Sequence, residues 1–169
     1  MYAYVYIRPD IAYVVSVLSR YLSNPRPMHW VTVKKVLRYL QKTKDYMLIY
    51  KQVDHLEIVG HSNSDFVGCY DDLKSTSRYV FMFIGGAISW KSVKQTLIAS
   101  STMQAEFVAY YGAATRAVWL KNFVSGLLVV DSISKPLPIY YDNSAAVFFS
   151  KNNKSNSGSK HLEIKYLTV

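Results

Sequence analysis

The sequence predicts an α/β fold in which a mixed sheet is flanked by helices, and three observations support this class. From residue 56 onward the chain reads as three strands, a long helix, a fourth strand and a short helix, which is an order typical of helices packed on a sheet. Half of the 169 residues are apolar, enough for one sizeable core. The residues before this region read as two short helices, so we expect one domain with a small appendage.

The appendage comprises residues 1–51. Asp10 can cap a helix over residues 11–22, which the Asn-Pro-Arg-Pro run at residues 24–27 ends. The apolar face of this helix is formed by Ala12, Val15, Leu18 and Leu22. A second helix is predicted over residues 29–41, and residues 46–51 are expected to form a strand. The second helix is expected to bury Trp30, Val33, Val36, Leu37 and Leu40.

Three strands follow a polar link at residues 52–55. The first is predicted over residues 57–63, and its period of two separates two faces. One face carries Val59, His61 and Asn63, and the other carries Ile58, Gly60 and Ser62. The polar residues 71–77 are expected to connect it to a buried strand at 78–84. Gly85-Gly86 predicts a hairpin turn, after which residues 87–93 return as the third strand.

A long amphipathic helix is predicted to begin at Ser101, because Ser101 and Gln104 form a capping-box pattern. Its apolar face recurs in steps of three and four, and Gly126 is expected to end it. That face consists of Ala109, Ala113, Ala117, Leu120 and Val124, with Glu106 in line with it. Carboxylates are seldom buried unless they are paired, protonated or bound to a metal. Spacing alone therefore favours a Glu106 that reaches solvent at the flank of the helix.

The last part of the chain alternates again between strand and helix. A fourth strand is predicted over residues 137–142 and a short helix over 143–150. Residues 150–160 are polar, basic and loop-like, and another element is expected to start at His161.

Acidic or near-acidic side chains stand at three places that such a sheet would bring together. They are Asn63 and Asp65 after the first strand, Glu106 on the helix, and Asp142 at the end of the fourth strand. Sites in open α/β sheets form beyond the carboxyl ends of the strands, and oxygen-only ligands suit Mg²⁺ or Mn²⁺. Two such ions about 4 Å apart can activate a water for phosphodiester cleavage. The alternative is that these are ordinary turn residues, since strand ends often carry Asp.

Basic charge is concentrated at the start of the chain, whose net charge is +9. Residues 1–51 hold nine Lys and Arg against two acids, whereas the remaining residues hold eleven against nine. This asymmetry favours a polyanionic partner, most simply nucleic acid, over a basic surface that is merely solvated. The candidate nucleic-acid-binding residues are Lys34, Lys35, Arg38, Lys151, Lys154 and Lys160.

Other features bear on the compartment. Cys69 is the single cysteine, which rules out an internal disulfide framework and a cysteine-based zinc site. No apolar run approaches the roughly 20 residues that a bilayer span needs, and no secretory signal pattern is present. We therefore expect an intracellular protein, cytoplasmic or nuclear, with no membrane partner.

Ordered motifs along essentially the whole chain resemble a known family. Two resemble the end of the reverse transcriptase of copia-type retrotransposons: Arg8-Pro9-Asp10-Ile11-Ala12 and Leu37-Arg38-Tyr39-Leu40. Five more resemble the ribonuclease H domain that follows it in the same polyprotein: Lys74-Ser75-Thr76-Ser77, Gly86-Ala87-Ile88-Ser89-Trp90-Lys91-Ser92, Ser101-Thr102-Met103-Gln104-Ala105-Glu106-Phe107, Tyr141-Asp142-Asn143-Ser144-Ala145-Ala146 and Ser159-Lys160-His161. The resemblance divides the chain into a reverse transcriptase remnant at 1–51 and a ribonuclease H-like domain at 55–169, cut short at its C-terminus.

The resemblance implies a ribonuclease H fold that cleaves the RNA strand of an RNA–DNA hybrid with two Mg²⁺ ions. The catalytic residues it implies fall on Glu106, Asp142 and the first aspartate of a Ser-Asp-x-Asp pattern. Here that pattern reads Ser62-Asn63-Ser64-Asp65, so the expected Asp is Asn63, whose neutral carboxamide replaces a bridging carboxylate poorly. Asp65 could lie on the same face, but a two-residue step moves a group by about 6–7 Å along the strand.

Two further positions bear on activity. Arg78 stands where the family usually has glycine, and His161 is implied to assist product release or proton transfer, unless it is a surface loop histidine. The sequence resembles a fragment of a decayed element with impaired catalysis. Three hypotheses follow: a metal-dependent nuclease, a nucleic-acid-binding module without chemistry, and a foldable remnant without a role.

Overall fold

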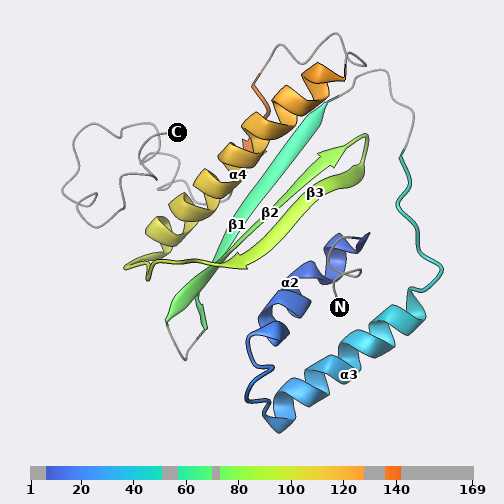
Figure 1. Cartoon of the computed structure of the whole chain (residues 1–169), viewed down its shortest axis with the longest axis vertical. Helices are drawn as coiled ribbons and strands as arrows, with labels where there is room; N and C mark the ends of the chain where they lie inside the picture. The colour runs from blue at the N-terminus through green and yellow to red at the C-terminus, as the bar shows by residue number, and fades with distance from the viewer. Residues whose placement is uncertain (1–6, 51–56, 70–72, 128–135, 142–169) are drawn as a thin grey trace.

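The computed structural model describes residues 7–50, 57–69, 73–127 and 136–141. Figure 1 labels the elements along the chain. The helices are α2 (Pro9–Ser19), α3 (Pro27–Lys42) and α4 (Thr102–Gly126), and the strands are β1 (Ile58–Cys69), β2 (Lys74–Phe83), β3 (Gly86–Lys94) and β4 (Ile139–Tyr140). The predicted α/β class is confirmed. Among the described helices, none combines the length and the apolar content that a membrane span requires.

The four strands form one mixed sheet in the order β3-β2-β1-β4. β2 pairs antiparallel with β1 on one side and with β3 on the other. β4 pairs parallel with β1, where His61 lies opposite Tyr140. β1 runs past its predicted end at Asn63, and Ser64 pairs with Ser77. Residues 74–77 are therefore the start of β2, and their prediction as part of a polar connection is wrong.

The β2–β3 hairpin turns one residue earlier than predicted. Ile84 and Gly85 have φ angles of 54° and 76°, and Phe83 pairs with Gly86. Two consecutive positive φ angles are the signature of the two-residue turn whose twist matches that of antiparallel strands. Gly86 is therefore the first residue of β3.

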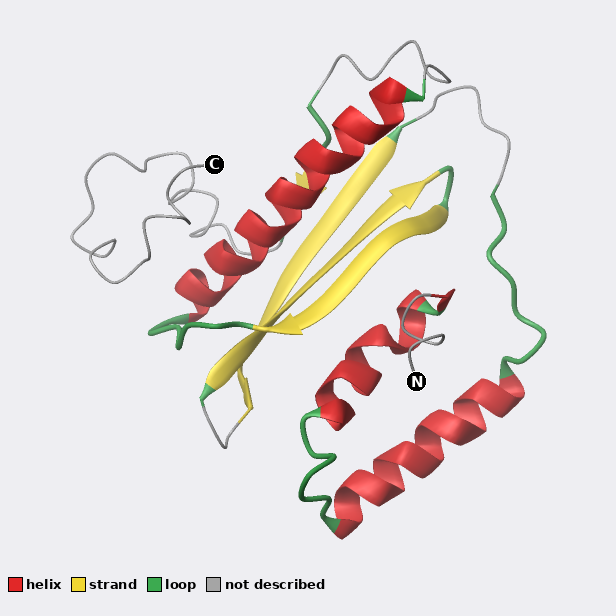
Figure 2. Cartoon of the chain, in the orientation of Figure 1, coloured by secondary structure: helices red, strands yellow, loops and turns green. Residues whose placement is uncertain are grey.

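Helix α4 covers one face of the sheet, as Figure 2 shows. The core there consists of Ile58, Phe81, Ala113, Ala117 and Leu120, so most of the predicted helix face is confirmed. The small alanines let the helix backbone approach the strands closely. Ser101 is the N-cap as predicted, and its hydroxyl accepts a hydrogen bond from the Gln104 amide at 3.2 Å. The helix ends at Gly126, also as predicted.

Helix α2 lies against the opposite face of the sheet. The Ser16 hydroxyl donates to the Ser92 carbonyl at 3.1 Å, and Arg20 donates to the Thr76 hydroxyl at 2.9 Å. The predicted cap at Asp10 is wrong. Arg8 is the N-cap residue, and Asp10 lies in the first turn, where its carboxylate pairs with Arg8 at 2.7 Å. The helix ends at Ser19, which leaves Leu22 exposed rather than on the apolar face.

The prediction that helix α3 buries an apolar face is wrong. None of its residues is buried, and Trp30 and Leu37 are 59% and 56% exposed. Its contacts are with α2 and are polar, such as the Tyr39 hydroxyl that donates to Asp10 at 2.7 Å. Within the described part of the chain, its apolar stripe is covered only in part, because Val33, Val36 and Leu40 are half-buried. The strand predicted at residues 46–51 is also wrong for residues 46–50, which are exposed and form no strand.

Candidate functional site

Glu106 is held inside the fold by the approach of α4 to β1. Its side chain is only 4% exposed, and its Oε1 accepts a hydrogen bond from the Ser64 backbone amide at 2.9 Å. Gln95 supports the same junction, because its Nε2 donates to the Ala105 carbonyl at 2.8 Å and to the Ser77 hydroxyl at 2.9 Å. The expectation that Glu106 reaches solvent is therefore wrong. A backbone N–H from a neighbouring strand provides a buried partner, which helical spacing alone cannot reveal.

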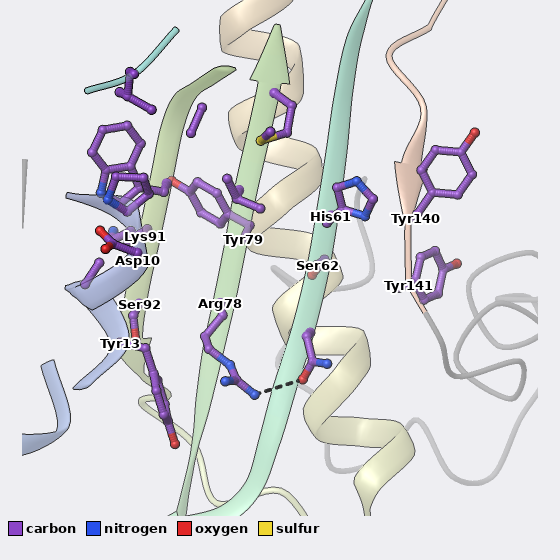
Figure 3. A pocket seen from close by; sticks show the side chains of 18 of the residues that line it. Asp10, Tyr13, His61, Ser62, Arg78, Tyr79, Lys91, Ser92, Tyr140 and Tyr141 are labelled. Carbon is purple, nitrogen blue, oxygen red and sulfur yellow. Dashed lines mark hydrogen bonds between the residues drawn. The ribbon is translucent and has the colours of Figure 1, made fainter. Parts of the chain in front are cut away.

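Asn63 lies on the opposite face of β1 from Glu106. Ser62 and Ser64, its neighbours on the strand, are buried toward α4, whereas Asn63 is exposed. Its Oδ1 accepts a hydrogen bond from Arg78 Nη2 at 3.2 Å, across the register pair that joins β1 to β2 (Figure 3). The Arg78 guanidinium also stacks over the Tyr13 ring, 4.4 Å from its centroid. Where the resemblance implies a catalytic Asp, this chain therefore has an amide that is hydrogen-bonded to the Arg78 guanidinium.

Asp65 lies on the same face as Asn63 and belongs to the same cluster. Its Oδ2 accepts a hydrogen bond from the Tyr13 hydroxyl at 2.8 Å. Burial raises the pKa of Tyr13 above its ordinary value, and this hydrogen bond raises it further. Sequence reasoning missed Tyr13, because the contact joins residues 52 positions apart and α2 carries no local pattern that indicates it.

The described residues do not fit a two-metal centre. Glu106 lies on α4 and contacts one face of β1, whereas Asn63 and Asp65 lie on the other face, toward α2, so β1 separates the candidate ligands. In the part of the chain that the structure describes, no group of three or more His, Cys, Asp or Glu side chains could hold a metal ion. Asp142 and His161, the other predicted catalytic residues, lie outside the described residues.

Only three of the six predicted nucleic-acid-binding residues lie in the described part of the chain. Lys34, Lys35 and Arg38 are exposed on α3, and Lys34 lies 5.8 Å from the Trp30 ring. Figure 1 shows α2 between this helix and the sheet, so these cations stand apart from Glu106. Lys151, Lys154 and Lys160 lie outside the described residues.

A groove of about 860 Å³ lies on the sheet face opposite α4. Its lining includes Tyr13, His61, Arg78, Trp90 and Tyr140, so aromatic rings and a guanidinium share one surface. Figure 3 shows Tyr13 coming from α2, Arg78 and His61 from neighbouring strands, and Tyr140 from the end of β4. Sequence analysis did not predict this groove, because its lining comes from α2, from all four strands and from connecting residues.

Comparison with known proteins gives the family. The chain is 39% identical over 166 residues, 98% of its length, to the "Retrovirus-related Pol polyprotein from transposon TNT 1-94" of Nicotiana tabacum. It is 32% identical over 161 residues to the corresponding polyprotein from transposon RE2 of Arabidopsis thaliana. The chain belongs to the Pol polyproteins of copia-type retrotransposons. This retrotransposon chain spans 12% and 11% of the length of those two relatives.

A third relative is of similar size to the Pol chain. The "Secreted RxLR effector protein 161" of Plasmopara viticola is 43% identical over 120 residues, which are 71% of the Pol chain and 84% of that protein. No protein-family model matches the chain, and no solved structure matches it.

Proposed function

We propose that this chain is the ribonuclease H-like region of a copia-type Pol polyprotein, joined to the end of the reverse transcriptase, and that its cleavage of RNA–DNA hybrids is impaired. The observation that carries the impairment is the Asn63 carboxamide, which is hydrogen-bonded to Arg78 on the sheet face opposite Glu106. A neutral amide offers one oxygen, and here that oxygen accepts from a guanidinium.

The buried Glu106 supports the ribonuclease H part of the proposal. A carboxylate that accepts a backbone N–H from the strand next to it is fixed in place, as a catalytic carboxylate must be. The family resemblance assigns this residue and Asp142 to the reaction. Because a neutral carboxamide stands at residue 63 where the resemblance implies a bridging carboxylate, we expect this chain to bind Mg²⁺ or Mn²⁺ weakly.

Arg78 adds a second obstacle. If residue 63 were an aspartate, its carboxylate would lie within reach of the guanidinium that already contacts Asn63. A bidentate ion pair between Arg and a carboxylate is a strong interaction, and the guanidinium repels any cation placed beside it. The substitution Asn63→Asp is therefore expected to form an ion pair with Arg78 before it serves catalysis.

The test is cleavage of a labelled RNA–DNA hybrid in Mg²⁺ and in Mn²⁺. Four proteins are compared: the natural chain, Asn63→Asp, the double variant Asn63→Asp/Arg78→Gly, and that double variant with Glu106→Gln. We expect no cleavage by the natural chain and little by either Asn63→Asp variant, because residue 63 and Glu106 lie on opposite faces of β1. Clear cleavage by the double variant that Glu106→Gln removes would show instead that the two residues share one site. Circular dichroism checks that each protein is folded. Cleavage by the natural chain that Glu106→Gln abolishes would refute the impairment.

A second candidate function is binding of hybrid or duplex without chemistry. The net charge of +9 and the exposed Lys34, Lys35 and Arg38 favour it. Contacts to phosphates release counterions, so the affinity should fall steeply between 50 and 200 mM salt by roughly 10³-fold or more if six phosphates are contacted. An affinity that does not change with salt would exclude this candidate.

A further inference from the structure

The groove opposite α4 has the size and the lining of a ligand site. Its volume of about 860 Å³ falls in the range of about 300–1,000 Å³ that small-ligand pockets occupy. It is lined by apolar and aromatic side chains together with a few polar groups. Asn63 and Arg78 belong to its lining, but the cleavage proposed above uses none of its aromatic residues.

Two rings in the groove stack on each other. His61 on β1 and Tyr140 on β4 are register partners on neighbouring parallel strands, with ring centroids 5.6 Å apart and planes 28° apart. Both side chains are exposed, Tyr140 at 59%. Aromatic side chains on the open face of a sheet are the usual means by which proteins stack the bases of single strands.

The same groove carries two cationic side chains that form no ion pair with the described residues. Arg78 and Lys91 line it, and the ion pair found among the described residues is between Arg8 and Asp10, not at Arg78. The Arg78 Nε is buried and has no hydrogen-bond partner in the described part of the chain. Asp10, the acid that also lines the groove, is paired with Arg8 at 2.7 Å and accepts from Tyr39. The groove therefore suits an anionic ligand with flat rings.

We propose that this groove binds a single strand of nucleic acid, with a base stacked on His61 and Tyr140 and a phosphate at Arg78 and Lys91. A duplex is excluded from this mode, because its bases are stacked on one another and cannot lie on a protein ring. The inference goes beyond the proposed ribonuclease function and is independent of it, since it requires neither Glu106 nor a metal ion.

The experiment measures fluorescence anisotropy of labelled 12-mers at 50 and 200 mM salt. The probes are a mixed-sequence RNA strand, the DNA strand of the same sequence, and the hybrid of that sequence. The variants are His61→Ala, Tyr140→Ala and Lys91→Gln in the whole chain. Matched controls are Tyr46→Ala and Lys44→Gln, which alter an exposed tyrosine and an exposed lysine outside the groove.

We expect both single strands to bind, and His61→Ala and Tyr140→Ala each to weaken binding about 5-fold or more, because base stacking on an aromatic ring is worth about 1–3 kcal/mol. Lys91→Gln should weaken it and reduce its dependence on salt, and the controls should change neither. The difference between the affinities for the RNA strand and the DNA strand then shows whether the 2′-hydroxyl contributes to binding. Since His61 and Tyr140 are exposed, these variants should fold normally, and circular dichroism checks it.

Three results would overturn the proposal. The first is equal weakening by the groove variants and their controls, which would indicate non-specific charge. The second is binding of the hybrid alone, which would place the contact elsewhere. The third is absence of strand binding together with a dimer in sedimentation that Tyr140→Ala dissociates, which would assign the groove to a second copy of the chain.

Discussion

Replacing Gly60 by alanine tests how closely β1 is packed against the core that positions Glu106. A Cβ atom at Gly60 would lie 2.6 Å from Phe81 Cε1 and 3.1 Å from Cδ1, well inside van der Waals contact. The Phe81 ring is 0% exposed and packs in the cluster with Ala113 and Leu120, so it has no free space to enter. Gly60 also donates its amide to the Pro138 carbonyl at 2.8 Å, which limits any shift of β1 away from the ring.

The expected cost follows from these contacts. Inserting a methyl group into a packed core costs about 1–3 kcal/mol, and removing glycine from a strand recovers roughly 0.5–1 kcal/mol. We expect Gly60→Ala to lower the free energy of unfolding by about 1–2 kcal/mol. Phe81→Leu removes the ring that the methyl meets, so the double variant should be more stable than the sum of the single effects predicts, by about 1 kcal/mol.

Urea unfolding followed by circular dichroism measures all four proteins of this cycle. Gly112→Ala is the matched control, because a Cβ there meets nothing within 4 Å in the middle of α4 and should stabilise the protein by about 0.5–1 kcal/mol. The reasoning is refuted if Gly60→Ala is neutral, or if the effects of Gly60→Ala and Phe81→Leu simply add.

Three further predictions concern the ends of elements. Ser101→Ala removes the hydroxyl that accepts from Gln104 and should cost about 1 kcal/mol, measured by urea unfolding; Ser101→Asp should retain most of the stability, and equal loss in both variants would contradict a capping role. Ile84→Asn relieves a positive φ of 54° at a β-branched residue and should stabilise by about 1 kcal/mol, seen as a higher Tm; an unchanged or lower Tm would show that the turn is not strained. The hydrogen bond from Arg8 lowers the pKa of Asp10 below its ordinary value of 3.8, so its stabilising contribution is present above that value and is lost as pH falls through the folded-state pKa. The pair is partly exposed, so Asp10→Asn should lower stability at pH 7 by at most about 1 kcal/mol, and this loss should become smaller as the pH falls below 3.8; a loss that does not change with pH would argue against the ion pair.

The sequence by itself determined the features that depend on neighbouring residues. The spacing of Ser101 and Gln104 located the start of α4, and the Gly85-Gly86 pair located the β2–β3 hairpin to within one residue. The alanine-rich period of α4 identified the helix face that enters the core. These signals are local, because capping, turn geometry and periodicity are set within a few residues of the chain.

The site could be predicted only as a set of candidates. The motifs named Asn63, Asp65 and Glu106, but they could not say on which side of β1 each side chain lies. The register of β1 against β2 places Arg78 beside Asn63, and the docking of α2 brings Tyr13 to Asp65. Both contacts join residues that are far apart in sequence.

Burial was likewise decided by tertiary structure. A helical period shows which residues share a face, but it does not show what covers that face. The apolar face of α4 packs against the sheet. A backbone amide of β1 provides the hydrogen-bond partner that a buried Glu106 carboxylate needs. The described residues cover the apolar stripe of α3 only in part, so Trp30 and Leu37 stay exposed. The difference arises from the free energy of burial, which depends on a partner surface that no short stretch of sequence contains.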